Sequence, residues 1–308
     1  MQVLRAIKEL ADIPGPICVA IGVFDGVHRG HEALIRRAMA EAKALDGTAV
    51  VLTFDPHPAR ILRPESAPHL LTSAAHKEHL IAASGCPFLL VVKFDAEFSA
   101  QSPSAFIEAL ARPENSLRCL CVGHQWAFGR NRAGNVDLLR SLGTRHGFTT
   151  VEIEPVRSGG ETISSTRIRR AIESGDFAAA SELLGRDYTI LGTVRHGAQL
   201  GGKIGFPTAN LAAHNEQFPP DGVYAVRAHL RGVGYSGVAN IGTRPTVDGH
   251  SGRILEVHLF DYSGDCYDAD MEVRFVAFLR PEKKFESVEA LKGQIARDVV
   301  TAKGMVDC

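Results

Sequence analysis

Two histidines three residues apart, His28 and His31, stand in a segment that reads GVFDGVHRGH. This segment overlaps an apolar run, residues 17–23, that is short and β-branched enough to form a buried strand of a parallel sheet. A helix that follows the strand would offer unpaired N–H groups and its positive dipole end to an anion, and Gly26 and Gly30 would let the backbone approach closely. We therefore predict that both imidazoles contact one bound polyphosphate; unrelated surface or cap histidines are the alternative.

A second candidate for phosphate binding is the sequence ISSTRIRR. Ser164 or Ser165 would cap a helix with an apolar inward face. Hydroxyls, backbone amides and guanidinium groups together form a cradle for a triphosphate, whereas a capped surface helix with solvated arginines is the simpler alternative. Open α/β sheets bind ligands beyond the carboxyl ends of their strands, where both motifs would fall, and this favours the phosphate site. The inward face comprises Ile168, Ala171 and Ile172, and the arginines are Arg167, Arg169 and Arg170.

The second half contains a glycine-rich stretch, GAQLGGKIG, that runs directly into FPTAN. Glycines let a backbone wrap around phosphates. Thr208 and Asn210 are two residues apart in an extended segment, so they point to the same side and supply hard oxygen ligands suited to Mg²⁺. The spacing is not that of a P-loop, and a flexible hairpin connection is the alternative.

A candidate general base lies in the sequence ILEVHLF, residues 254–260. Its leucines and valine alternate as one apolar face of a strand, which leaves Glu256 and His258 on the other face. A glutamate in such a place is most often solvated. If loops cover that face, the carboxylate could instead accept a proton from a substrate.

The elements that position the first two motifs follow an alternation of strands and helices. This rhythm predicts an α/β domain with a Rossmann-like parallel sheet covered on both faces. Besides the run that precedes the histidines, strands are expected at Ala49–Phe54, Phe88–Val92, Leu117–Val122 and Thr150–Ile153, and helices at Glu32–Leu45, Ser104–Leu110 and Val136–His146.

After residue 185 the sequence pattern changes to apolar, glycine-containing runs, which predict an antiparallel barrel or sandwich with one closing helix. We therefore expect two domains, residues 1–185 and 186–308. The expected strands are Tyr188–Val194, Gly222–Leu230, Ser236–Ile241, Ile254–Phe260 and Met271–Leu279, and the expected helix is Val288–Asp298.

Composition excludes several classes of protein. The 308 residues are 45% hydrophobic and 22% charged, with a formal net charge of −1, which argues against disorder and against nucleic acid as the main partner. The sequence has no stretch apolar enough to span a membrane and no signal-peptide pattern, so we expect a cytoplasmic protein with no membrane partner. Six cysteines without a C-x-x-C spacing are interpreted as small buried apolar residues.

Several of these motifs resemble those of known enzyme families. GVHRGH followed by ISSTRIR resembles the nucleotidyltransferase superfamily, which joins a nucleoside monophosphate to an acceptor phosphate and releases pyrophosphate. More narrowly, TFDPHP, FGRNRAGNVDLL and, in the second half, FPTAN, GVYAV, VANIGTRPTV, LEVHLFD and FLRPEKKF resemble the bacterial bifunctional riboflavin kinase/FMN adenylyltransferase family, also called FAD synthetase. The resemblance extends through nearly the whole chain.

For the first domain, the resemblance implies binding of ATP and FMN and in-line attack of the FMN phosphate on the α-phosphorus of ATP, with Mg²⁺ neutralising pyrophosphate. Catalysis would consist of positioning and charge stabilisation. The residues implied as catalytic are His28, His31 and Arg169; those implied in ATP or phosphate binding are Gly22, Phe24, Gly30, Ser164 and Thr166; and those implied in flavin binding are His57, Gln125 and Trp126.

For the second domain, the resemblance implies a riboflavin kinase with a six-stranded Greek-key barrel and a C-terminal helix. Glu256 would accept the proton of the ribityl 5′-hydroxyl as it attacks the γ-phosphate of ATP. Thr208 and Asn210 would hold Mg²⁺ with the phosphates, and FMN would be the intermediate shared by the two reactions. The glycines implied in closing over the phosphates are Gly197, Gly201 and Gly205.

The sequence departs from the family pattern at three places. Val23 replaces a usual asparagine, the segment His124–Trp126 replaces an acidic or amide pair followed by phenylalanine, and Lys203 stands beside the place of a usual arginine. One alternative is therefore a riboflavin kinase with a degenerate first domain. Another is a flavin-sensing regulator that binds RNA through the arginines of ISSTRIRR, which the near-zero net charge disfavours. A homo-oligomer remains open.

Overall fold

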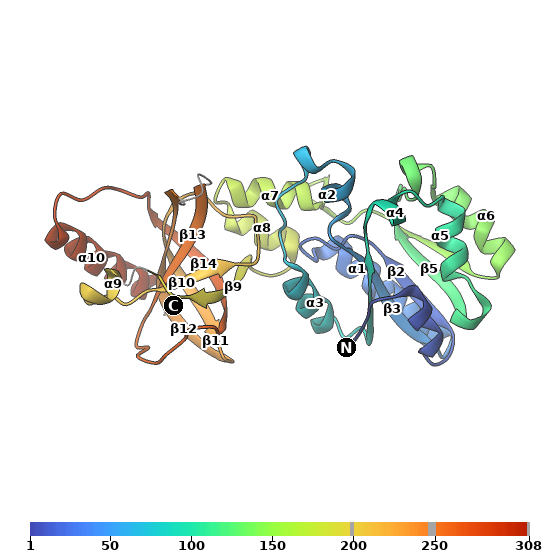
Figure 1. Ribbon diagram of the computed structural model, residues 1–308, viewed down its shortest axis with the longest axis horizontal. Helices are drawn as coiled ribbons and strands as arrows, with labels where there is room; N and C mark the ends of the chain where they lie inside the picture. The colour runs from blue at the N-terminus through green and yellow to red at the C-terminus, as the bar shows by residue number, and fades with distance from the viewer. Residues whose placement is uncertain (198–199, 246–250, 307–308) are drawn as a thin grey trace. The chain divides into compact units, whose positions relative to one another are not determined.

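The computed structural model describes residues 1–197, 200–245 and 251–306 (Figure 1). Contacts between residues divide the chain into two compact units. The first unit comprises Met1–Pro68 and Ala74–Ser165, and the second comprises His69–Ser73 and the chain from Thr166 onward. Each unit has its own sheet and its own core, so each is described by itself.

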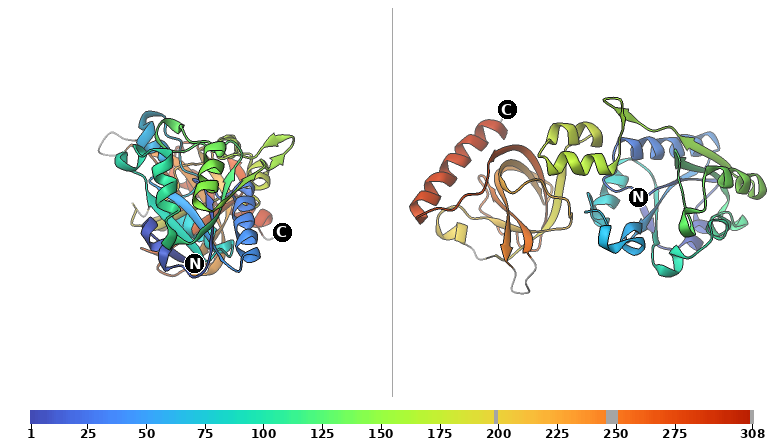
Figure 2. Two further views of the ribbon diagram at one scale, coloured as in Figure 1. Left: turned by 90° about the vertical axis from the view of Figure 1, so that its right-hand side faces the viewer. Right: turned by 90° about the horizontal axis from the view of Figure 1, so that it is seen from above.

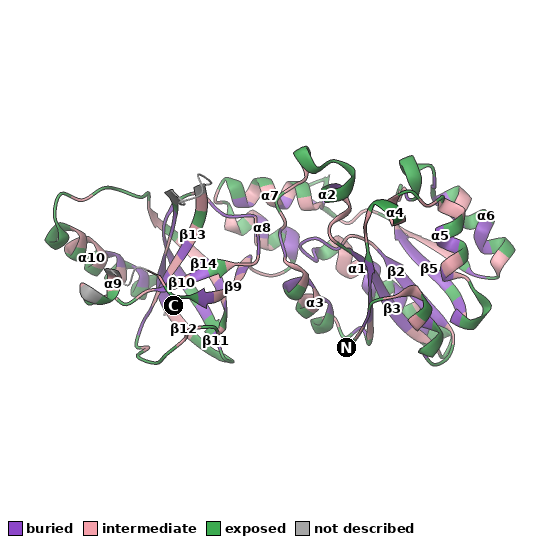
Figure 3. Cartoon of the chain, in the orientation of Figure 1, coloured by how far each residue is buried: buried purple, intermediate pink, exposed green. Residues whose placement is uncertain are grey.

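The first unit is built on a six-stranded sheet in which all neighbouring strands are parallel. Its strand order is β1-β4-β3-β2-β5-β6, so the carboxyl ends of the central strands β2, β3 and β5 lie side by side. Figure 3 shows that the central strands are buried along almost their whole length. The strands are β1 (Gln2–Leu4), β2 (Ile17–Ile21), β3 (Thr48–Asp55), β4 (Phe88–Lys93), β5 (Leu117–Gly123) and β6 (Thr149–Ile153).

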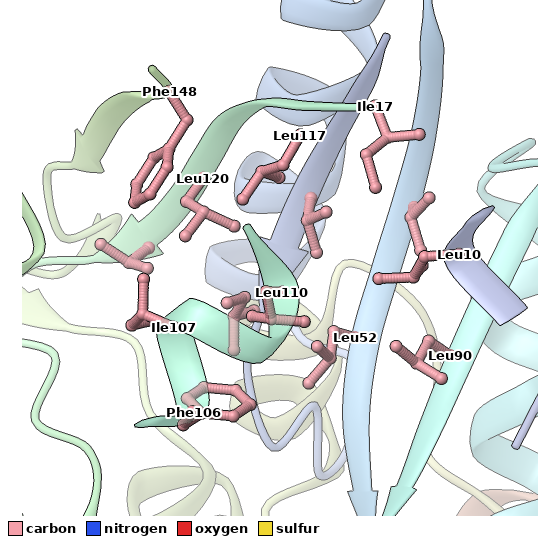
Figure 4. Packing of buried hydrophobic residues seen from close by; sticks show 14 of the residues in the cluster. Leu10, Ile17, Leu52, Leu90, Phe106, Ile107, Leu110, Leu117, Leu120 and Phe148 are labelled. Carbon is pink, nitrogen blue, oxygen red and sulfur yellow. The ribbon is translucent and has the colours of Figure 1, made fainter. Parts of the chain in front are cut away.

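Helices cover both faces of this sheet because its strands are apolar on both sides. In β2, Cys18 and Ala20 pack with helices α1 and α3, whereas Ile17 and Val19 pack with α5 and α6. Figure 4 shows the second of these layers, where Ile107 and other side chains of α5 face the sheet. The helices are α1 (Arg29–Ala44), α2 (Pro58–Leu62), α3 (Ala74–Ala83), α4 (Ala96–Ser99), α5 (Pro103–Leu110) and α6 (Val136–His146).

Short elements complete the first unit. A two-stranded hairpin precedes the ISSTRIRR segment, and the remaining pieces are short 3₁₀ helices. The hairpin is β7 (Arg157–Ser158) with β8 (Glu161–Thr162), and the 3₁₀ helices are η1 (Ile7–Asp12), η2 (Pro64–Ser66), η3 (Pro113–Asn115) and η4 (Arg130–Arg132).

The second unit is a closed antiparallel barrel with the strand order β10-β13-β12-β11-β14-β9. Burial alternates along β9, as expected for a strand with one face toward the barrel interior. This confirms the predicted six-stranded barrel. The strands are β9 (Thr189–Arg195), β10 (Ala209–Ala213), β11 (Gly222–Leu230), β12 (Val233–Pro245), β13 (Ser251–Leu259) and β14 (Asp270–Arg280).

One long helix, α10 (Val288–Val306), lies along the outside of the barrel, as the right-hand view of Figure 2 shows. Its Ala302 and Val306 pack on Val223 and Val238 of the barrel wall. The predicted closing helix is therefore confirmed, and it extends eight residues beyond Asp298. The other helices of this unit are α7 (Ser165–Glu173), α8 (Phe177–Leu184) and α9 (Leu200–Lys203).

The grouping of contacts differs from the predicted division at residue 185, because α8 and most of α7 belong with the barrel. The reason is aromatic packing: the Phe177 ring stacks on Phe275, with centroids 5.6 Å apart, and meets Tyr224 edge to face at 5.9 Å. A second tie comes from residues 69–73, where the Leu71 carbonyl accepts a 2.6 Å hydrogen bond from the buried Asn215 amide.

These contacts lead to a prediction about the stability of fragments that contain the barrel. We expect residues 187–308 to fold alone and to form FMN, as the change of pattern in the sequence indicates. A fragment that begins at Thr166 should resist denaturant better, because it keeps Phe177 over Tyr224 and Phe275. Urea unfolding of both fragments, with FMN formation measured on each, checks this; an unfolded shorter fragment would place the boundary of independent folding near Thr166.

The cysteine interpretation is confirmed for four residues. Cys18, Cys86, Cys119 and Cys121 are buried free thiols, and Cys266 is half-buried and free. Cys308 and residues 198–199 of the glycine-rich stretch lie outside the described residues, as does the side chain of Lys203. In the described part of the chain, no helix is both long enough and apolar enough to cross a membrane.

Candidate active sites

The first candidate site is the turn between β2 and α1. His28 is the N-cap of α1, and its Nδ1 accepts a hydrogen bond from the His31 backbone N–H at 3.3 Å. The two imidazoles stack with centroids 3.6 Å apart and planes 14° apart. A Cβ at Gly30 would lie 3.1 Å from the His28 ring, so only glycine leaves the stacked pair undisturbed. The structure therefore brings the two predicted histidines together at a helix N-terminus.

These histidines border a cavity of about 520 Å³ at the carboxyl ends of β5 and β6. The cavity also reaches Gln125 and the segment just before Ser164. A site at this edge of a parallel sheet agrees with the general placement of ligands in open α/β folds. Its walls are formed by His28, Gly30, His31, Leu34, Gly123, His124, Gln125, Ile153, Glu154, Pro155, Val156, Arg157, Thr162 and Ile163.

The turn that carries the histidines has an unusual backbone. Phe24 and Val27 both have positive φ angles, 54° and 38°, which are unfavourable for a bulky or β-branched residue. The Phe24 ring is fully buried in the core and lies 5.1 Å from the His31 ring, so any contact of Phe24 with phosphate would be through its backbone. A Cβ at Gly22 would lie 3.1 Å from that ring.

The segment that departs from the family pattern forms a well-defined turn after β5. His124 Nδ1 lies 2.9 Å from Glu152 Oε1, and Arg140 donates to the other carboxylate oxygen at 2.8 Å. Gln125 adopts a positive φ of 56° and borders the cavity. Hydrogen bonds to Glu152, from the His124 ring and from the Gln125 backbone N–H at 3.4 Å, thus hold this replacement segment in one shape.

Trp126 does not border the cavity of the histidines; it stacks on Phe128 at 4.3 Å. The two rings end a series of six aromatic side chains at the carboxyl ends of β3 and β4, with neighbouring centroids 4.3–6.5 Å apart. Sequence reasoning missed this cluster, because its members come from four separate stretches of the chain. They are Phe54, Phe94, Phe98, Phe106, Trp126 and Phe128.

The other residues predicted for this site have local roles in the structure. His57 caps α2 through an Ala59 N–H, 3.1 Å from its Nδ1. Arg169 donates from Nε to the His69 carbonyl at 2.7 Å, within the second unit. Ser164 and Thr166 flank Ser165, at which α7 begins. The roles of these residues toward ATP and flavin stay predictions.

Ser165 is the first residue of α7 and also contacts the turn that carries the histidines. Its hydroxyl donates 2.9 Å to the backbone carbonyl of Asp25, in the turn before His28. Within the first unit, the beginning of the motif, residues 163–165, is thereby tied to the histidine turn. Along α7, Ile168 and Ile172 are fully buried, which confirms two positions of the predicted inward face, and Ala171 is half-buried.

The second candidate site is a row of polar side chains across three strands of the barrel. Glu256 of β13 lies opposite Asn210 of β10 and opposite Asn240 of β12. Residues directly opposite one another in a sheet project to the same face, so these three side chains share one side. His258 follows on that face, and its Nδ1 lies 2.8 Å from the Pro207 carbonyl oxygen. The predicted shared face of Glu256 and His258 is confirmed.

The glycine-rich stretch packs tightly on the two predicted metal ligands. A Cβ at Gly197 would lie 2.1 Å from the Asn210 amide, and one at Gly201 would lie 3.1 Å from Thr208 Oγ1 and 2.4 Å from the Phe206 carbonyl. Gly205 has a φ of 92°, which side chains rarely adopt. Two oxygen-bearing side chains under a glycine cradle fit a hard cation such as Mg²⁺.

These residues border a cavity of about 330 Å³ that extends to the start of α10. On its far side, Arg280 makes a hydrogen-bonded ion pair with the buried Asp298, 2.8 Å from Nη2 to Oδ2. Asn240 donates to Glu282 at 3.0 Å. Sequence reasoning missed Asn240, which only the strand register places beside Glu256. The polar residues bordering the cavity are Thr208, Asn210, Asn240, Glu256, His258, Arg280, Glu282, Lys283 and Asp298.

A parallel sheet with a histidine pair at a helix N-terminus, followed by a barrel with a carboxylate beside a glycine cradle, defines a two-domain transferase of phosphoryl and nucleotidyl groups. Comparisons with known proteins agree. The family described as FAD synthetase matches residues 11–167, and the family described as riboflavin kinase matches residues 184–306.

Full-length relatives carry both activities in their names. "Bifunctional riboflavin kinase/FMN adenylyltransferase" of Escherichia coli strain K12 is 39% identical over 307 residues, 98% of this chain and 97% of the relative. The protein of that name from Pseudomonas fluorescens is 37% identical, over 99% and 98% of the two chains. A crystal structure titled macrolide-efflux protein from Streptococcus pneumoniae is similar over 98% of each chain, with a TM-score of 0.82 and 29% identity. The chain belongs to the family of bifunctional riboflavin kinases/FMN adenylyltransferases.

Proposed function

We infer that the chain phosphorylates riboflavin to FMN in its barrel and adenylylates FMN to FAD in its α/β unit. The observation that carries this conclusion is that the two enzyme families match the two halves in order, each over a cavity with suitable chemistry. Both reactions use ATP, so riboflavin, FMN and ATP are the small-molecule partners.

For the kinase reaction, we propose that Glu256 accepts the proton of the ribityl 5′-hydroxyl. The hydroxyl oxygen bonds to the γ-phosphorus of ATP as the bond to the β,γ-bridging oxygen breaks, which yields FMN and ADP. Asn210 and Asn240, on either side of Glu256, are placed to hold the carboxylate and the hydroxyl in one orientation. Thr208 and Asn210 would hold Mg²⁺, which neutralises phosphate charge when it is bound.

For the adenylyltransferase reaction, we propose that a phosphate oxygen of FMN bonds to the α-phosphorus of ATP as pyrophosphate leaves. No proton need be removed from the attacking phosphate. His28 Nδ1 accepts a hydrogen bond from the His31 N–H, so a neutral His28 carries its ring proton on Nε2. In that tautomer the Nε2–H group can donate a hydrogen bond to a phosphate oxygen. His28 and His31 together would stabilise the charge that grows on pyrophosphate.

The aromatic cluster supports a place for the flavin. Offset stacking and edge contacts with rings stabilise a planar tricyclic ligand, and the half-buried Trp126 ring is held in place by its stacking on the buried Phe128. We propose that the isoalloxazine ring of FMN lies against this part of the cluster, near Gln125. His57, placed between two prolines at the start of α2, remains a candidate for the same pocket.

Incubation of the pure protein with riboflavin, ATP and Mg²⁺, followed by chromatography of the flavins, tests the proposal. FMN together with FAD supports it. FMN alone would identify a kinase with a degenerate first domain, and Val23 and the segment Gln125–Trp126 would then be the first positions to revert to the family residues. Formation of neither flavin would contradict both activities. An ATP-containing, reducing cytoplasm suits these substrates and the free thiols.

A further inference from the structure

A lysine is buried beneath the histidine turn. Lys77, on the first turns of α3, is only 8% exposed. Its Nζ lies 3.3 Å from the Val23 carbonyl oxygen, 3.4 Å from the Phe54 carbonyl oxygen and 3.4 Å from Thr53 Oγ1. The ammonium group therefore bridges the chain just beyond β2 and the carboxyl end of β3.

An ammonium group in such a place needs a reason, because burial disfavours its charged form. Desolvation lowers the pKa of Lys77, while the nearby carboxylates of Asp25 and Asp55 oppose that effect. Asp25 is itself only 4% exposed. A methionine or leucine would fill the same space without the desolvation penalty, so packing alone does not account for an ammonium group at this position.

What the ammonium group contacts is the start of the strained turn. Phe24 and Val27, at φ 54° and 38°, persist in these conformations only if the surroundings hold the turn firmly. The Val23 carbonyl accepts two hydrogen bonds, from Lys77 and from the Thr53 hydroxyl at 3.0 Å. Two residues later, the Asp25 carbonyl accepts from Ser165. The turn is thus fixed at its beginning and at its middle, directly before His28.

We propose that Lys77 is a positioning residue for nucleotidyl transfer, which holds the turn so that the stacked His28 and His31 rings face the pyrophosphate of ATP. The proposal rests on the proposed adenylyltransferase reaction. It gives a task to Val23 as well: its backbone carbonyl is the anchor point, and this does not require a polar side chain.

A role in positioning predicts different effects on kcat and on KM for ATP. A loosened turn still leaves helix N–H groups and the cavity available to ATP, but it no longer holds the imidazoles where charge develops. A misplacement of about 1 Å is enough to lower a rate by about 100-fold. Loss of Lys77 should therefore lower kcat far more than it raises KM for ATP.

The test compares Lys77→Met with Lys43→Met, an exposed lysine of α1 in the same unit. We expect Lys77→Met to lower kcat for FAD formation by about 30- to 100-fold, with KM for ATP within about threefold and FMN formation within about twofold. Lys43→Met should leave all three within about twofold. FAD formation by a folded Lys77→Met protein within about threefold of wild type would overturn the proposal, as would a loss that lies wholly in KM.

Two further measurements test whether the Val23 carbonyl is an anchor for the histidine turn. If Lys77→Met fails to fold, Thr53→Val removes the other donor to the Val23 carbonyl at nearly constant volume, and kcat for FAD formation should fall by about 5- to 10-fold. An unchanged kcat would then refute the anchor. Histidine ring proton resonances of His28 and His31 should shift in Lys77→Met and not in Lys43→Met; this readout needs no activity, so it separates failure of the anchor from failure of the adenylyltransferase assignment.

Discussion

Replacement of Glu256 with glutamine is expected to abolish most FMN formation, by about 100-fold or more, while riboflavin still binds. The amide keeps the shape of the carboxylate in the row between Asn210 and Asn240 but cannot take the proton of the attacking hydroxyl. Steady-state FMN formation and riboflavin binding by fluorescence titration, measured on the one variant, separate chemistry from affinity.

The matched control for this variant is Glu289→Gln, which removes one carboxylate from the exposed start of α10. FMN formation should stay within about twofold of wild type in the control. FAD formation from supplied FMN should persist in both variants, because it belongs to the other unit. Near wild-type kinase activity in Glu256→Gln would show that Glu256 is only a solvated strand residue.

Much of this architecture was accessible from local pattern. Alternation of apolar and polar residues in ILEVHLF places Glu256 and His258 on one face, and the strand pairing around β13 bears this out. Buried parallel strands have continuous apolar sequences, so five of the six strands of the first sheet can be predicted. The edge strand β1, of three residues, is too short to give such a signal.

The parts that sequence could not supply depend on contacts between distant segments. Asn240 becomes a neighbour of Glu256 only through the register of β12 with β13. Lys77 looks like any polar residue of a helix, and nothing near it in the chain indicates that its ammonium group reaches the Val23 carbonyl just beyond β2. Likewise, α8 follows the sheet in the sequence but packs with the barrel through the Phe177 ring.

Loss of the His31 side chain is expected to lower FAD formation from FMN by about 100-fold or more, with FMN formation within about twofold of wild type. The imidazole lies 3.6 Å from that of His28, centroid to centroid, beside the cavity, so it is placed to stabilise charge on the departing pyrophosphate rather than to bind the adenosine. His31→Ala should therefore change kcat more than KM for ATP.

Both reactions measured on the His31→Ala protein control for misfolding, and His79→Ala, at an exposed position of α3, controls for the loss of a histidine from the same unit. Equal loss of both activities would indicate structural damage, and unchanged FAD formation would remove His31 from the catalytic residues. The comparison with Lys77→Met is informative in its own right. If Lys77 acts only by placing the histidine pair, then in a protein that already lacks the His31 ring the further loss caused by Lys77→Met should be well below its effect in wild type, because residues that act as a unit are not additive.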